Sequence, residues 1–562
     1  MFKKVTALLL TVLLSAAILV GCGGSGNGKD QSNNTSGGDT KGETSETPKN
    51  REVTIGITGD AYSLDPYPRN ETITNALNKH MFDCLVETDN ELKTQPALAE
   101  SWTTDENAKT WTFKLREGVK FHNGNDFTAD DVIFSFDRAN ITEKSAFDYA
   151  LATIESYTKK DDYTIEIVCY KPNALLLSHL KDVMILDKES CDGQTDEWIA
   201  LNPIGTGRYK LLEHVREDKL VFERNDDFWG DLPEATKVTF KPISNEGTRT
   251  ANILSGAVDL IDDVPVRDVE VLKANKDIEV LGNPSLRVMY INLAGWTDNP
   301  SPDAPMPLKA PDGSNPLKDV KVREALYRAI DEEQIVTQIM NGHATAAATY
   351  IPDNFNGYNG EVKRLEYDPV LAEKLLDEAG YPKQSDGYRF EMTLDASNDR
   401  YVNDGDIATA IAGFWEKIGI KVNLNLMSRT VFFTYIGTAN KEGDKTHACM
   451  TGWADSGGES ALMALDLLYS MKQEGPVKEG YGGVNRGYYL NPEVDALIDE
   501  AMATADYDER AKVMQKIWKI AADDVSYIPL HFQEDIYASS KKIKYNPRDD
   551  KYIYAWDIEF VD

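Results

Sequence analysis

The chain has 562 residues, of which 60 are Lys or Arg and 93 are Asp or Glu, so its formal net charge at pH 7 is −33. Nucleic acid and anionic lipid surfaces are poor partners for so acidic a protein, because like charges repel. The acidity can serve to steer cationic solutes or only to keep the protein soluble, and screening at physiological salt favours the second interpretation.

The N-terminus has the pattern of a secretory signal. Lys3 and Lys4 precede an apolar run from Val5 to Val20, which is shorter than the about 20 residues of a bilayer-spanning helix. The run ends in the sequence LVGC, which is typical of a lipobox. We therefore expect residues 1–21 to be a cleaved signal peptide and the thiol of Cys22 to carry a lipid, which anchors the protein to the outer face of the cell membrane.

Residues 22–50 consist mainly of Gly, Ser, Asn, Thr and charged residues, which is typical of a flexible linker. The remaining chain is too long for a single hydrophobic core and suits two or three domains. A boundary is expected near residue 292, because a strand-like YINL at 290–293 is followed by a Pro-rich run at 300–316. A strand-like YIPL returns at 527–530.

Residues 97–138 read as a strand, a turn and a helix. Trp111, Phe113 and Leu115 alternate with polar residues, which predicts a half-buried strand. Thr128 and Asp131 then have the spacing of a capping box in front of an apolar helix face.

A second clear pattern runs from residue 368 to residue 459. Asp368, Pro369 and Gly380 are the start and stop signals of a helix. Apolar residues then alternate at 390–394, follow helical spacing at 407–418 and alternate again at 422–426, which predicts a βαβ unit with parallel strands. Ligands bind beyond the carboxyl ends of such strands, so loops 396–403 and 452–459 are candidates for a site.

The segments WTFKLREGVKFHNG at 111–124 and TADDVIFSFDR at 128–138 closely resemble the signature of extracytoplasmic solute-binding proteins of the peptide/nickel family, which serve ABC importers. Further segments with this likeness occur at 202–211, 225–230, 251–260, 316–330 and 491–501. The resemblance implies a two-lobed α/β fold of the periplasmic-binding-protein type II with a hinge. It also implies an inserted subdomain at about 86–201 within lobe I (51–291), then lobe II (292–527) and a return to lobe I (528–562).

The same resemblance implies the function and part of the site. The protein is expected to close its lobes over a peptide and to deliver it to a membrane permease. In peptide-binding relatives, an aspartate three residues after a GW motif binds the ligand's amino group. Here Ser456 holds that position after Trp453, with Asp455 one residue earlier and Glu459 at the place of a second acid. Either Asp455 takes the role or the ligand lacks a conventional amino terminus.

Other expected site residues follow from the resemblance as well. Arg400 lies near the place of an arginine that binds the ligand carboxylate, and its planar guanidinium suits that contact. The ligand-binding residues expected beside it are Trp453, as an apolar wall of the cleft, and Tyr401, Asn70, Thr72, Asn485 and Arg486. A non-peptide solute such as an oligosaccharide, an opine or a metal chelate is the alternative, and a secreted hydrolase using Asp455 and Glu459 is a remote one.

No cofactor is expected, and the protein is expected to be a monomer. The seven histidines show no metal-binding spacing, so direct metal coordination is not expected, whereas a metal held through a chelator stays open. Cys84, Cys169, Cys191 and Cys449 contain no CxxC pair. An oxidising compartment permits a disulfide between them, but so large a core does not require one.

Overall fold

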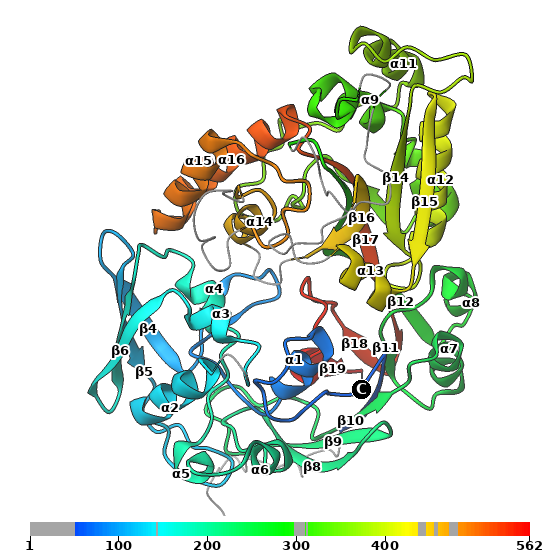
Figure 1. The fold of residues 1–562 in the computed structure, drawn as a ribbon. Coiled ribbons are helices and arrows are strands. Elements are labelled where there is room, and N and C mark those ends of the chain that lie inside the picture. The colour runs from blue at the N-terminus through cyan, green and yellow to red at the C-terminus, as the bar shows by residue number, and fades with distance from the viewer. Residues whose placement is uncertain are drawn as a thin grey trace, which may run out of the picture. The chain divides into compact units, whose positions relative to one another are not determined.

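The computed structural model describes residues 51–141, 144–296, 310, 313–436, 446–454, 459–470 and 482–561 (Figure 1). All of them belong to one compact unit, Asn50–Asp562. Cys22, Asp455 and Ser456 lie outside the described residues. No described helix is both long enough and apolar enough to cross a bilayer.

An 11-stranded mixed sheet organises the structure. Its strand order is β15-β14-β16-β12-β17-β11-β1-β10-β9-β8, and β13 pairs with β17 beside this path. The strands are β1 (Glu52–Ile57), β8 (Tyr209–Val215), β9 (Lys219–Arg224), β10 (Lys237–Pro242), β11 (Leu260–Ile261), β12 (Ile278–Leu293), β13 (Ala344–Ala346), β14 (Phe390–Ser397), β15 (Ile420–Met427), β16 (Ala448–Trp453) and β17 (Tyr527–Ser540).

The long strands β12 and β17 connect the two halves of this sheet. Ile278–Pro284 of β12 pairs with the end of β17, which also pairs with β11, whereas Val288–Leu293 pairs with β16. The register of the β12–β17 pair shifts between Pro284 and Val288. The predicted lobe boundaries at 292 and 528 fall at the ends of these strands, and the division into lobes stays a prediction.

Residues 99–201 contain a separate four-stranded antiparallel sheet with its helices, drawn in blue and cyan in Figure 1. Its order is β4 (Ala99–Thr104), β5 (Thr110–Leu115), β7 (Thr164–Cys169) and β6 (Ile154–Asp161). The helices are α2 (Ala129–Ala139), α3 (Asp148–Leu151), α4 (Leu176–Leu180), α5 (Lys188–Cys191) and α6 (Asp196–Leu201). The predicted strand at 111–115 and the capping box of Thr128 and Asp131 are confirmed.

The predicted βαβ unit is present. β14 and β15 are parallel, and α12 (Asp404–Lys417) joins them. The stripe that packs α12 against the sheet includes Ile407, Ile411 and Trp415, all fully buried. β16 then pairs with β14 in parallel, so the carboxyl ends of these three strands lie at one edge.

Helices surround the sheet on either side of β12 and β17 (Figure 1). The predicted helix capped by Asp368 is α11, which begins at Pro369. The remaining helices are α1 (Thr72–Asn78), α7 (Glu246–Ser255), α8 (Val269–Lys273), α9 (Val320–Arg328), α10 (Glu332–Gln334), α11 (Pro369–Glu378), α13 (Arg429–Ile436), α14 (Ser460–Leu467), α15 (Pro492–Ala503) and α16 (Tyr507–Asp523). Two short strand pairs complete the structure, β2 (Val86–Thr88) with β3 (Thr94–Pro96) and β18 (Ile543–Tyr545) with β19 (Ile558–Phe560).

Cys84, Cys169, Cys191 and Cys449 are buried, and within the described residues they form no disulfide. They pack as small apolar side chains, since burial raises the pKa of the Cys84 and Cys191 thiols to about 12 and keeps them protonated.

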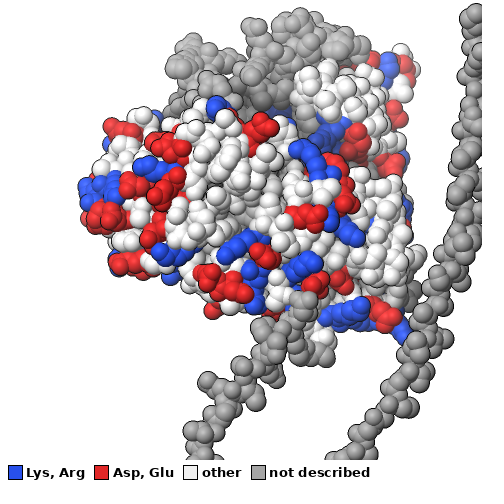
Figure 2. Space-filling view, turned by 90° about the horizontal axis from the view of Figure 1, so that it is seen from below, with Lys and Arg blue, Asp and Glu red and all other residues white. Residues whose placement is uncertain are grey.

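On the face shown in Figure 2, acidic and basic side chains are interspersed. The acidic excess therefore forms no continuous surface on this face.

Candidate ligand-binding cleft

A cleft of about 2460 Å³ is lined by segments from both ends of the described chain. β1 and α1 contribute from the N-terminal part, and residues 549–553 contribute from the C-terminal part. Ser285–Arg287 of β12 and Gln533–Ile536 of β17 also line it. Loop 398–403 and Trp453 enter from the carboxyl ends of β14 and β16, as ligand sites of α/β sheets commonly do.

The size of this cleft bears on the ligand. Small-molecule sites usually measure roughly 300–1,000 Å³, so this cleft has room for an extended molecule or for a smaller one with water.

Close to the cleft, the backbone N–H of Ala174 donates to the backbone oxygen of Met502 at 2.8 Å. Met502 itself lines the cleft, so the segments carrying the four-stranded sheet and α15 meet beside it.

Five of the residues predicted from the sequence line this cleft. They are Asn70, Thr72, Arg400, Tyr401 and Trp453. Glu459, Asn485 and Arg486 do not line it, and Asp455 and Ser456 lie outside the described residues.

Tyr401 is fixed at the end of β16. Its hydroxyl donates to the backbone oxygen of Gly452 at 3.1 Å and lies 3.1 Å from Oγ1 of Thr451. The buried carboxylate of Asp404 accepts hydrogen bonds from the backbone N–H groups of Arg400 and Tyr401, both at 3.1 Å. These contacts hold loop 398–403 in place, so the side chain of Arg400 starts from a rigid backbone.

Two guanidinium groups lie close to the Tyr401 ring. Cζ of Arg400 is 5.0 Å and Cζ of Arg287 is 5.7 Å from its centroid, which suits cation–π contacts. Neither guanidinium has a carboxylate within 4.0 Å among the described residues. Burial and the positive charge of Arg287 lower the pKa of Arg400. The pair therefore presents two charges that a ligand anion can compensate.

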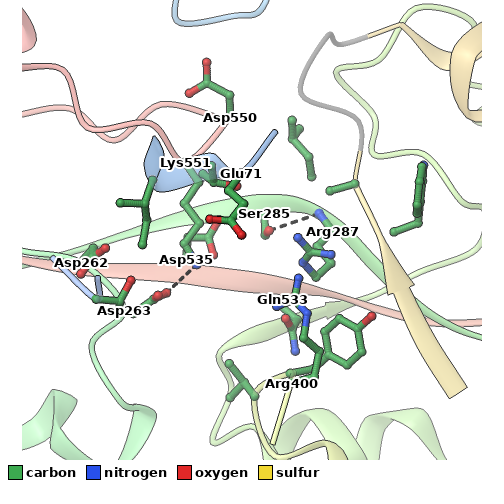
Figure 3. Close-up of a pocket in the computed structure, with 18 of the residues that line it drawn as sticks. Glu71, Asp262, Asp263, Ser285, Arg287, Arg400, Gln533, Asp535, Asp550 and Lys551 are labelled. Atoms are coloured by element: carbon green, nitrogen blue, oxygen red, sulfur yellow. Dashed lines mark hydrogen bonds and ion pairs between the residues drawn. The ribbon is translucent and has the colours of Figure 1, made fainter. Parts of the chain in front are cut away.

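Several carboxylates at the other side of the cleft, in contrast, have basic partners. Lys551 forms ion pairs with Asp263 and with Asp535, the latter at 3.2 Å, in the cluster seen in Figure 3. Arg548 binds Asp550 at 2.8 Å. These charges largely compensate each other within the protein.

Of the three predicted residues that do not line the cleft, two have side-chain hydrogen-bond partners elsewhere in the protein. Nδ2 of Asn485 donates to the backbone oxygens of Tyr469 at 3.0 Å and Tyr489 at 2.8 Å, which fixes the turn before α15. Arg486 is buried. Glu459 caps α14 and accepts a hydrogen bond from Arg510 of α16. Their ligand-binding roles stay predictions.

The sequence interpretation missed Arg287 and Gln533 as lining residues. Arg287 stands in the run LRVMYIN of β12, between the buried residues Leu286 and Val288. A charged residue inside an apolar strand is a signal that could have marked it, because charges are rarely placed there without a function or a partner. Gln533 carries no comparable signal in the sequence.

Metal binding by the protein itself has no visible basis in the part of the chain that is described. There, no group of three or more His, Cys, Asp or Glu side chains is arranged to hold a metal ion. His80, His122 and His179 are enclosed by protein, and burial lowers the pKa of each to about 4. They are neutral at physiological pH.

Comparison with known proteins identifies the protein family to which the chain belongs. The sequence model of "Bacterial extracellular solute-binding proteins, family 5 Middle" matches residues 93–475. The glutathione-binding protein GsiB of Escherichia coli strain K12 is 28% identical over 502 residues, which are 88% of this chain and 91% of GsiB.

Solved structures agree on the fold. HbpA2 from Haemophilus parasuis matches with a TM-score of 0.77 at 24% identity, covering 91% of this chain and 100% of that one. The periplasmic binding protein DppA from Helicobacter pylori, in complex with the peptide STSA, matches with a TM-score of 0.71 at 23% identity and covers 91% and 99%. The fold is thus the two-lobed α/β fold of periplasmic binding proteins. The chain belongs to family 5 of the bacterial extracellular solute-binding proteins, the substrate-binding components of ABC importers.

Proposed function

We propose that the protein is a lipid-anchored, monomeric receptor on the outer face of the cell membrane, which captures peptides and delivers them to the permease of an ABC importer. Membership in family 5 supports the receptor role. The lipobox at Cys22 supports the anchor, and the GsiB and DppA relatives, named for binding glutathione and a peptide, support the class of ligand.

The observation that carries the peptide proposal is the guanidinium of Arg400, which lines the cleft and forms no ion pair with any residue that the structure describes. Its planar group donates two parallel hydrogen bonds to a carboxylate, the group at the C-terminus of every unmodified peptide. A neutral oligosaccharide would leave this charge uncompensated when the cleft closes, which is costly. Trp453 and Tyr401 add apolar and aromatic surface for side chains.

The proposed mechanism is closure of two lobes, without bond chemistry. The register shift in the β12–β17 pair supports placing the flexing point near residues 284–288 of β12, between the predicted lobes. Small-angle scattering with and without saturating ligand tests closure, and identical curves would contradict it. An unchanged ligand mass after long incubation tests the absence of catalysis.

Mass spectrometry of ligands that co-purify with the folded protein tests the proposal directly. Calorimetry with the identified compound, with synthetic peptides of several lengths and with glutathione then ranks their affinities. We expect peptides to be recovered and to bind. A recovered sugar or metal chelate, together with no binding by any peptide, would replace the peptide proposal by another solute for the same receptor.

A further inference from the structure

The cleft contains a cationic subsite that one ordinary peptide carboxylate would not fill. Figure 3 shows Arg287, Gln533 and Arg400 gathered in one part of the cleft, apart from Asp262 and Asp263. They come from β12, from β17 and from the loop after β14, which are far apart in the sequence. All three line the same cavity.

The positive charges of the two arginines are not neutralised by an ion pair within the described part of the chain. In the described part of the chain, neither Arg287 nor Arg400 forms an ion pair, and Asp263 is already bound to Lys551. The two positive charges repel each other, and the repulsion grows when a closing cleft excludes water. One carboxylate on the pair leaves a net positive charge behind, whereas two carboxylates balance it.

Gln533 gives an independent sign of a ligand. Its side chain is only 7% exposed, yet its Nε2 has no hydrogen-bond partner among the described residues. A buried donor without an acceptor is unfavourable by about 1–3 kcal/mol in general. The adjacent arginines supply only further donors, so no acceptor is provided within the described part of the chain, and an anionic ligand would supply one.

The subsite is also held in a fixed shape. The Tyr401 ring lies next to both guanidinium groups and is anchored to β16 through Gly452 and Thr451. The backbone N–H of Arg287 donates to Oγ of Ser285 at 3.2 Å, the dashed line between these two residues in Figure 3. Preorganised donors of this kind bind an anion with little loss of side-chain freedom.

We propose that Arg287, Gln533 and Arg400 together bind two carboxylates at one end of the ligand, so that the protein prefers peptides whose C-terminal residue is Asp or Glu. This inference rests on the proposed peptide function. Arg400 holds one carboxylate, and Arg287 with Nε2 of Gln533 holds the second.

Calorimetry with matched peptide pairs tests it, each pair identical except for a C-terminal Glu or Gln. The wild-type protein should bind the Glu peptide about 10- to 100-fold more tightly, as expected for hydrogen bonds to a charged group. The Arg287→Gln variant should lose most of this preference while still binding the Gln peptide. Gln533→Leu should reduce the preference by a smaller factor.

Arg216→Gln is the matched control, because it removes the same charge from an exposed residue outside the cleft lining. Equal affinities for both peptides in the wild-type protein would overturn the inference and leave peptide binding intact. A preference that survives in Arg287→Gln would overturn the assignment to Arg287. Failure of all peptides to bind would overturn both the inference and the proposed function. The wild-type comparison needs no variant, so it decides even if a variant fails to fold.

Discussion

Nη2 of Arg510 donates a hydrogen bond to Oε2 of Glu459 at 2.8 Å, and both side chains are buried. The pair joins the start of α14 to α16, and Arg510 also donates to the backbone oxygen of Thr504 at 2.8 Å. Glu459 therefore already has a positive partner within the protein.

We expect Glu459→Gln to destabilise the protein, because it leaves the charge of Arg510 buried and uncompensated. Removing one partner of a buried ion pair typically lowers the free energy of unfolding by about 3–5 kcal/mol. Urea unfolding measures this loss, and ligand affinity should change little. Unchanged stability together with weakened binding would instead support the role of Glu459 as an amine-binding acid.

We expect Asp455→Asn to weaken the binding of a peptide with a free amino terminus by about 2–5 kcal/mol, the typical cost of removing one partner of a buried charge pair. The charged amine must otherwise leave water without a partner when the cleft closes. Calorimetry with a peptide and its N-acetylated form measures the effect. The wild-type protein should discriminate between the two forms and the variant should not; equal discrimination by both proteins would exclude Asp455 as the contact.

We expect Gly452→Ala to weaken ligand binding and to lower stability by about 1–3 kcal/mol, as overpacking does. A Cβ at this position would lie 2.8 Å from Sδ of Met289, 2.9 Å from Cε1 of Tyr401 and 3.2 Å from Cδ of Arg287. The new methyl group therefore displaces the ring that supports the arginines. Calorimetry and thermal unfolding check both effects.

Gly413→Ala is the matched control for that substitution. Gly413 lies within α12, and a Cβ there meets no atom within 4 Å. Alanine should stabilise the helix by about 0.5–1 kcal/mol and leave binding unchanged. Equal binding by the Gly452→Ala and Gly413→Ala variants would show that Tyr401 does not need its present position.

We expect Cys22→Ala to release the protein from membranes, because the thiol is the expected acylation site. Fractionation of cells that produce the full-length variant measures its distribution. Retention of the variant on membranes after removal of the signal peptide would contradict lipid anchoring at Cys22.

We expect the carboxyl group of Asp262 to contribute stability that is lost as the pH rises from about 4 to about 7. Burial, followed by the negative charge of Asp263, raises the pKa of Asp262 to about 7. An aspartate in the unfolded chain loses its proton near pH 4. Between these values the folded state binds more protons than the unfolded state, so raising the pH favours unfolding. Arg249, whose Nε lies 3.7 Å from Asp262 Oδ1, and Lys551 partly oppose the shift.

Urea unfolding across this pH range, in the wild-type protein and in Asp262→Asn, measures the contribution of the carboxyl group. The asparagine cannot ionise, so the wild-type protein should lose stability relative to the variant as the pH rises through this range. Identical pH profiles for the two proteins would show that Asp262 ionises normally.

Local patterns in the sequence predicted local structure well. The strand β5, the capping box of α2, the ends of α11 and the parallel βαβ unit of β14, α12 and β15 all depend on neighbours within a few turns or on a short crossover. Periodicity and capping residues encode such neighbours directly. The family resemblance added the correct fold class.

The composition of the cleft depends on distant pairings and could be predicted only in part. Arg400 and Trp453 follow strands of the βαβ region, so topology places them near one edge. Arg287 and Gln533 meet them only because β12 pairs with both β16 and β17, and no periodic pattern encodes that pairing. Glu459 was predicted as a site residue, but the structure pairs it with Arg510. No pattern in the sequence indicates that α16, which carries Arg510, packs against the start of α14.

The strand β17 lies between β12 and β11 in the sheet, yet it is almost the last part of the chain to be synthesised. The ribosome therefore releases the middle of the sheet after nearly all of its other strands. Pairings between such distant segments also form slowly. With the predicted secretory signal at residues 1–21, this order of synthesis favours export through the membrane before folding, because the strand that completes the sheet emerges when export is already under way.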